Sequence, residues 1–160
     1  MRYQIREKLL HITEDSAITD ETGAVRYQVN GKLFSLHDTL VMRDAAGAEV
    51  ATIRRQLIAL TPTYTITRGG QELAEVRKRL LSFLGERMVI DIPGPDDLEL
   101  KGNLFEHEYT IERGGQVVAT VSKRWFALSA TYGVEVAPGE DDVLILATVL
   151  VLDLAEDREH

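Results

Sequence analysis

The chain has 160 residues, a net charge of −8 and no cysteine. Its length suits one domain, so we expect a single domain over residues 1–160. The lack of cysteine excludes disulfides, thiol catalysis and Cys-ligated metal centres, and the negative charge predicts no binding to nucleic acid. Charges interrupt residues 1–15 before an apolar stretch forms, so we expect no secretory signal and a cytoplasmic protein.

Turn-forming residues divide the chain into short segments that suit strands. In chain order, DETG occupies residues 20–23, NG residues 30–31 and DAAG residues 44–47. Two further breaks follow at PGPDD, residues 93–97, and at KGN, residues 101–103. Alternating segments between turns about 8–12 residues apart predict an all-β sandwich or barrel.

The centre of the chain contains one hairpin pattern twice. YTITRGGQELAEVRKR (residues 64–79) and YTIERGGQVVATVSKR (residues 109–124) are identical at 11 of 16 positions, at an offset of 45. In both, a β-rich segment precedes Gly-Gly, which tolerates positive φ at both turn positions, and an alternating segment follows. We therefore predict two equivalent β-hairpins, with a weaker third copy at EVATIRRQLIAL, residues 49–60.

The second strand of each hairpin has a small, apolar face that ends in a cation. The residues of this face are Ala51, Ile53 and Arg55, then Ala74, Val76 and Lys78, then Ala119, Val121 and Lys123. Because side chains alternate between the two faces of a strand, this face is predicted to point to the core. The same alternation predicts that Trp125 lies in the core, like Leu57 and Leu80.

The last element is predicted to be a buried helix over about residues 140–156. Its centre, VLILATVLVL at residues 143–152, is apolar on every side, so it must be buried all round. Ten apolar residues are too few for a bilayer span, which needs about 20, and the acidic residues 140–142 suit a helix N-terminus. A closed β-barrel of antiparallel hairpins around this helix would bury it and remove the sheet edges. Deletion of the last twenty residues is therefore expected to prevent folding.

Three stretches of the chain carry a family resemblance. They are residues 1–40, the DAAGAEVATIRRQ hairpin, and GNLFEHEYTIERGGQVVATVSKRWFALSATYGVEV followed by DDVLILATVLVLD. With these stretches the chain resembles a bacterial member of the LURP-one-related family over nearly its whole length. The resemblance implies the fold of the tubby C-terminal domain and of phospholipid scramblases, a twelve-stranded β-barrel threaded by a hydrophobic C-terminal helix. Ala130 departs from the family's pattern, which often has an acidic residue in the loop before Thr131 and Tyr132.

The family also implies a class of ligand. Tubby domains bind phosphoinositide headgroups through basic surface residues, and scramblase-like proteins associate with membranes. The resemblance therefore implies an anionic phospholipid headgroup as a partner and a peripheral place at the inner membrane face. No ligand motif of the family transfers residue by residue, so candidate contacts must come from the charges of this chain.

Four arginines are the candidate ligand-binding residues. Arg54, Arg77, Arg79 and Arg124 lie toward the ends of the second strands of the three hairpins. If these ends gather on one side, they form a basic rim that binds phosphate, for which guanidinium groups suit bidentate contacts. The alternative is that they pair with Asp and Glu or keep the strand edges soluble.

Three other cations are predicted to face the core, where a charge needs a partner. Arg55, Lys78 and Lys123 follow the apolar face, and Asp153 interrupts the apolar helix. We therefore expect a structural ion pair between Asp153 and one of these cations.

No pattern in the chain predicts catalysis, a metal or a cofactor. The four histidines, His11, His37, His107 and His160, are interpreted as ordinary surface or strand residues, because FEHEYT lacks the second histidine of H-E-x-x-H. There is no G-x-S-x-G, and the Gly-Gly pairs lack the G-K-[ST] of a phosphate loop. We therefore expect a non-enzymatic binding or scaffold domain. The alternatives are a protein-interaction module with no lipid role and an enzyme whose site is not visible in the sequence.

Overall fold

The structure is a computed structural model of the whole chain. It describes residues 1–6, 16–32, 39–58, 61–79, 87–92, 97–104, 106–125 and 131–159. Within these ranges, side chains are described except those of residues 6, 32, 57–58, 61–62, 78–79, 87–91 and 155–159.

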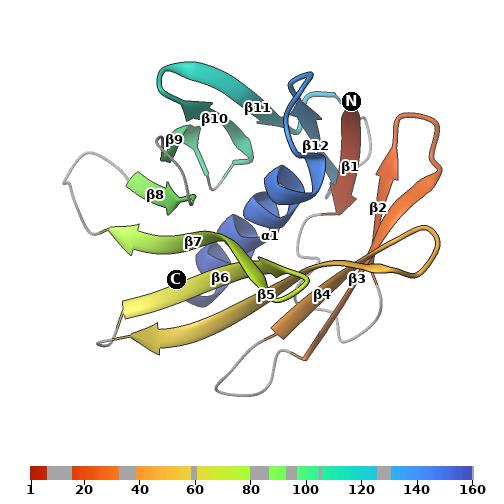
Figure 1. Cartoon of the computed structure of the whole chain (residues 1–160). Helices are drawn as coiled ribbons and strands as arrows, with labels where there is room; N and C mark the ends of the chain where they lie inside the picture. Colours follow the sequence, from red (N-terminus) through yellow and green to blue (C-terminus); the bar gives the residue numbers. More distant parts are fainter. Residues whose placement is uncertain are drawn as a thin grey trace.

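The described chain consists of strands and their connecting turns, followed by one helix (Figure 1). The strands are β1 (Arg2–Arg6), β2 (Ser16–Asp20), β3 (Val25–Lys32), β4 (Thr39–Asp44), β5 (Glu49–Ile58), β6 (Thr61–Arg68), β7 (Gln71–Arg79), β8 (Arg87–Asp91), β9 (Leu98–Asn103), β10 (Glu108–Arg113), β11 (Gln116–Ser122) and β12 (Thr131–Val136). The helix α1 spans Asp142–Glu159. The mainly β class, the antiparallel hairpins and the C-terminal helix are confirmed, and the helix begins two residues later than expected.

The strands pair antiparallel in sequence order, and the first strand also pairs with the last. β1 lies against β12 over five residue pairs, from Arg2–Glu135 to Arg6–Thr131. The described pairing is thin at two places, because β1 and β2 share two residue pairs and β8 and β9 share two. The strands curve around α1, which runs through the middle of the molecule (Figure 1).

Four hairpins place a bulge at the same point. The register shifts directly after Ile18 in β2, Met42 in β4, Ile66 in β6 and Ile111 in β10. Each of these four side chains is fully buried. A bulge sharpens the local twist, so the repeated bulge helps each hairpin to bend around the helix. The equivalence of the two predicted Gly-Gly hairpins therefore extends to two others.

The hairpin turns are of two kinds. Gly69 and Gly70 have φ of 57° and 80°, and Gly114 and Gly115 have nearly the same values, 57° and 83°. Positive φ at both positions favours the tight turn that matches strand twist, and glycine has no steric penalty there. In the β2–β3 and β4–β5 turns, an aspartate at the strand end accepts backbone N–H groups instead. Asp44 Oδ1 accepts from the N–H of Ala46 at 3.0 Å and of Ala48 at 2.9 Å.

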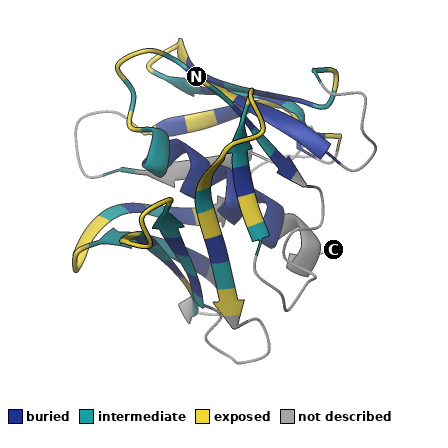
Figure 2. Ribbon diagram, turned by 90° about the vertical axis from the view of Figure 1, so that its right-hand side faces the viewer, coloured by how far each residue is buried: buried dark blue, intermediate teal, exposed yellow. Residues whose placement is uncertain are grey.

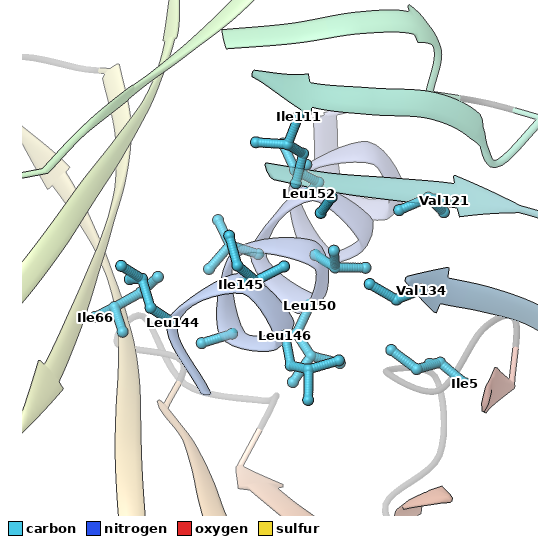
Figure 3. Close-up of a cluster of buried hydrophobic side chains, with 14 of the residues drawn as sticks. Ile5, Ile66, Ile111, Val121, Val134, Leu144, Ile145, Leu146, Leu150 and Leu152 are labelled. Carbon is cyan, nitrogen blue, oxygen red and sulfur yellow. The ribbon is translucent and has the colours of Figure 1, made fainter. Parts of the chain in front are cut away.

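The core lies between the helix and the inner face of the sheet. Every residue from Leu144 to Leu154 is buried, whereas the exposed residues gather on the turns and outer faces (Figure 2). In Figure 3, Ile66, Ile111 and Val134 reach the helix from different strands. Ala51, Ala74 and Ala119 are also buried, which confirms that the small faces point inward. The apolar run of the helix, residues 144–152, is thus buried, as its lack of a polar face requires.

Candidate functional site

A polar cluster is buried near the C-terminal part of α1. The carboxylate of Asp153 lies 2.9 Å, through Oδ1, from Nε2 of His107, and Oδ2 accepts a hydrogen bond from the hydroxyl of Tyr132. All three residues are buried. A buried carboxylate is costly unless donors or charges compensate it, and these two side chains supply donors. We call His107, Tyr132 and Asp153 the buried triad.

His107 is held in an unusual backbone conformation. It lies in the turn between β9 and β10 with a φ of 51°, which few residues other than glycine adopt. Its N–H donates to the carbonyl of Leu104 at 3.2 Å, and the N–H of Glu106 donates to Asn103 Oδ1 at 3.2 Å. The turn therefore sets the direction in which the His107 side chain leaves the backbone. The imidazole ring stacks on Tyr132, with the ring centroids 4.2 Å apart. The triad thus ties the β9–β10 turn and β12 to the helix.

A second polar cluster closes the end of β11 beside the triad. The carboxylate of Glu108 accepts from the Ser122 hydroxyl at 2.8 Å and from the Lys123 N–H at 3.0 Å. The Nε of Arg124 lies 3.9 Å from the same carboxylate, with the Arg124 side chain 86% exposed. Since Ser122 also accepts from the Arg124 N–H, this cluster sets the position of an exposed cation.

Three of the four candidate arginines have described side chains, and these three lie at two places. Arg54 and Arg77 are exposed on β5 and β7, which both flank β6. Arg77 already binds the carboxylate of Glu75. Arg124 follows β11, which β8, β9 and β10 separate from β7. The side chain of Arg79 lies outside the described residues.

The predicted cationic partner of Asp153 has a mixed outcome. Arg55 lies opposite Tyr64, on the inner face as expected, and it is half-buried. Lys123 is half-buried too, but it lies beyond the end of β11 in a bend. The side chain of Lys78 lies outside the described residues. The described partners of Asp153 are His107 and Tyr132, and its ion pair with Arg55, Lys78 or Lys123 stays a prediction.

Trp125 is placed differently from the expectation. Because β11 ends at Ser122, the alternation of faces does not continue to Trp125, which lies in a turn and is half-buried. The guanidinium carbon of Arg2 lies 4.3 Å from the centre of its ring. The prediction that Trp125 belongs to the core is therefore wrong, and the side chains of Leu57 and Leu80 lie outside the described residues.

The other end of the helix is held by charges. Arg113 Nη1 lies 2.8 Å from each carboxylate oxygen of Glu140, and Arg68 donates to Asp141 at 2.9 Å. Burial raises the pKa of Asp141, but Arg68 and the backbone N–H of Leu144 outweigh it, so this pKa lies below its usual value. These contacts fix where the helix starts. The acidic side chains described at the two ends of the helix therefore already have partners.

Neither a metal centre nor a membrane-spanning helix is found in the described part of the chain. No group of three or more His, Asp or Glu residues there is arranged to hold a metal ion. In the same residues, no helix combines the length and the apolar character needed to cross a bilayer.

The family is decided by a match that spans most of the chain. A family model described as LURP-one-related matches residues 1–153. The chain belongs to the LURP-one-related family. An X-ray structure of a protein from Arabidopsis thaliana is similar to this LURP-one-related chain, with a TM-score of 0.71 and 21% identity over 97% of this chain and 90% of the other. This likeness shows the fold alone. No curated protein matches the chain.

The sequence interpretation missed two residues of the buried triad of this LURP-one-related chain, His107 and Tyr132. His107 was assigned to an ordinary surface or strand position, but it is 4% exposed and contacts the helix. Its partners are 46 and 25 positions away, so no short motif contains them. The only local sign was Asp153 itself, a carboxylate within an apolar run that required a buried partner.

Proposed function

We propose that this LURP-one-related chain is a non-enzymatic binding domain that takes an anionic, phosphate-bearing group on its outer surface. The ligand is the headgroup of an anionic phospholipid or another phosphorylated molecule, and the domain acts at the inner face of the membrane. The sheet serves as a closed barrel whose interior holds the helix.

The packing of α1 is the observation that carries this proposal. Residues 144–154 are buried side by side along the axis of the molecule, so side chains occupy the space where an internal ligand would lie. A ligand must therefore bind from outside. The resemblance to tubby and scramblase-like domains supports the same class of ligand.

The strand directions support the position of the binding surface. Successive strands are antiparallel, so β5, β7 and β11 run in the same direction. We expect the C-terminal ends of these strands to share one end of the molecule, and the proposed surface combines Arg77, Arg79 and Arg124 near these ends with Arg54 from the middle of β5. Arginine is suited to this role because its planar guanidinium forms two parallel hydrogen bonds to a phosphate.

Flotation with liposomes tests the proposal. The protein should float with vesicles of phosphatidylcholine that contain phosphatidylserine or a phosphoinositide, and not with phosphatidylcholine alone. Binding should weaken as the salt rises from 50 to 300 mM, because screening shortens the range of the attraction. The triple variant Arg54→Gln, Arg77→Gln, Arg124→Gln should lose binding.

A control variant removes a positive charge away from the proposed surface. Arg26 is exposed near the opposite end, beside the β2–β3 turn, and lies 3.8 Å from Asp20. Arg26→Gln removes one charge without touching the proposed surface, so it should float like the wild type. Equal flotation of the triple variant and the wild type, or binding that ignores anionic lipid, would contradict the proposal. A protein-interaction module would bind none of the vesicles.

A further inference from the structure

The buried triad contains a carboxylate that needs compensation. The side chain of Asp153 is 9% exposed and that of His107 is 5% exposed. With a neutral imidazole, the pair carries one negative charge away from water. With an imidazolium, the pair is neutral overall, and Nε2–H donates to Oδ1 as a charge-assisted hydrogen bond. Burial disfavours the first arrangement more strongly than the second.

We propose that His107 is the counter-ion of Asp153, and that the tie between the β9–β10 turn, β12 and the helix is a pH-sensitive lock. The lock is firm while His107 is protonated, and it weakens as the pH rises and the imidazolium loses its proton. This proposal does not rest on the proposed function, because it concerns the interior of the molecule.

The stacking of the two rings supports a protonated imidazole. The rings of His107 and Tyr132 lie 4.2 Å apart between centroids and 21° from parallel. The face of a tyrosine ring attracts a cation, so Tyr132 favours the imidazolium through its ring. Its hydroxyl stabilises the carboxylate of Asp153 at the same time. One residue thus stabilises both charges of the pair.

Among the described residues, the other charged groups near the triad are Glu108, Lys123 and Arg124. On β10, next to His107, the carboxylate of Glu108 is directed to Ser122 and to the Lys123 N–H. At the end of β11, the guanidinium of Arg124 lies near Glu108 and is largely exposed. Lys123 is half-buried at the same end. Among the described side chains of the helix, Asp153 is the charged group that contacts the imidazole.

The sign of the pH dependence follows from linkage. A histidine that binds its proton more tightly in the folded chain stabilises the fold below the titration midpoint of the unfolded chain. This stabilisation is lost as the pH rises through the midpoint of the folded chain. The lock is therefore expected to hold at mildly acidic pH and to release above neutral pH.

Nuclear magnetic resonance of the histidine ring signals in the wild-type protein gives the direct test. We expect His107, assigned by comparison with His107→Gln, to titrate at least one pH unit above the histidines of the urea-unfolded chain. That shift means tenfold tighter proton binding in the folded chain, about 1.4 kcal/mol. A midpoint at or below the unfolded value would overturn the proposal and would favour Lys78, Lys123 or Arg55 as the counter-ion.

A second experiment shows whether the carboxylate of Asp153 raises the titration midpoint of His107. In Asp153→Asn the amide keeps the shape of the side chain but removes its charge, so the midpoint of His107 should fall below the unfolded value, because burial then outweighs the weaker attraction of the Tyr132 ring. An unchanged midpoint in Asp153→Asn would overturn the pairing. If this variant does not fold, unfolding of the wild type decides, since its stability should fall from pH 6 to pH 9 more than that of His107→Gln. If the stability of the wild type and of His107→Gln fell equally over this range, the proposed lock would be wrong.

Discussion

Arg68 and Arg113 occupy the same position in the two copies of the repeated hairpin, and each binds a carboxylate directly before the central helix. Arg68 binds Asp141 and Arg113 binds Glu140. The duplicated sequence thus places two equivalent guanidinium groups around one helix start. Tyr3 adds a third contact, from β1 to the carboxylate of Asp142.

Removal of these arginines should destabilise the protein unequally. Arg113→Gln is expected to cost about 1–2 kcal/mol, because it leaves the partly buried Glu140 without the guanidinium nitrogen that reaches both of its oxygens. Arg68→Gln should cost about 0.5–1 kcal/mol, since both partners are more exposed. Urea unfolding measures both values, and Arg26→Gln is the control, expected to lie within about 0.5 kcal/mol of the wild type.

Acid should weaken the contact between Arg68 and Asp141. The pKa of Asp141 is lowered in the folded protein, with the opposing effect of burial outweighed by Arg68 and Leu144. A lowered pKa contributes stability above the unfolded value of about 3.9, and this stability is lost as the pH falls through the folded value. Between pH 5 and pH 2, Arg68→Gln should therefore lose less stability than the wild type. If the free energy of unfolding of the two proteins changed in parallel with pH, the Arg68–Asp141 pair would have no role in this dependence.

The small inner face of β7 should not accept a larger side chain. Ala74 is fully buried opposite Ile66, on the face that the helix covers. Ala74→Leu is expected to cost about 1–3 kcal/mol, because the added methyl groups overpack a filled core. The exposed Val117 is the matched control, and Val117→Leu should change the free energy of unfolding by less than about 0.5 kcal/mol. Thermal unfolding of both variants checks the difference.

Two glycines with positive φ should differ in their tolerance of alanine. At Gly102, a Cβ would lie 2.6 Å from the carbonyl oxygen of Glu108 and 2.8 Å from Tyr109 Cα, whereas at Gly23 nothing lies within 4 Å. Gly102→Ala should therefore cost about 3 kcal/mol, from strain plus a backbone clash. Gly23→Ala should cost only about 1 kcal/mol, from φ alone. Similar losses in urea unfolding would show that β9 yields to the added methyl group.

The sequence predicted the parts of the fold that local periodicity controls. Gly-Gly pairs and the alternation after them located the β6–β7 and β10–β11 hairpins, and the unbroken apolar run located α1. The inward direction of Ala74 and Ala119 followed from the same alternation. These features depend on residues that are neighbours in the chain, so a single sequence contains them.

The buried triad could not be predicted in the same way. His107 lies in a short turn, and its contact with Asp153 joins residues 46 positions apart. The alternation rule also failed at Trp125, because it applies only while the strand continues and β11 ends at Ser122. Contacts that depend on where a strand stops, or on which turn meets the helix, require the three-dimensional arrangement.

The order of the elements along the chain determines when the core can form during synthesis. The strands precede α1, so the ribosome presents their apolar inner faces before the segment that covers them exists. Stable folding of the sheet is therefore expected only after the helix has left the ribosome. Such a chain is exposed to aggregation in that interval, and it gains most from chaperones that shield β-rich surfaces until the helix emerges.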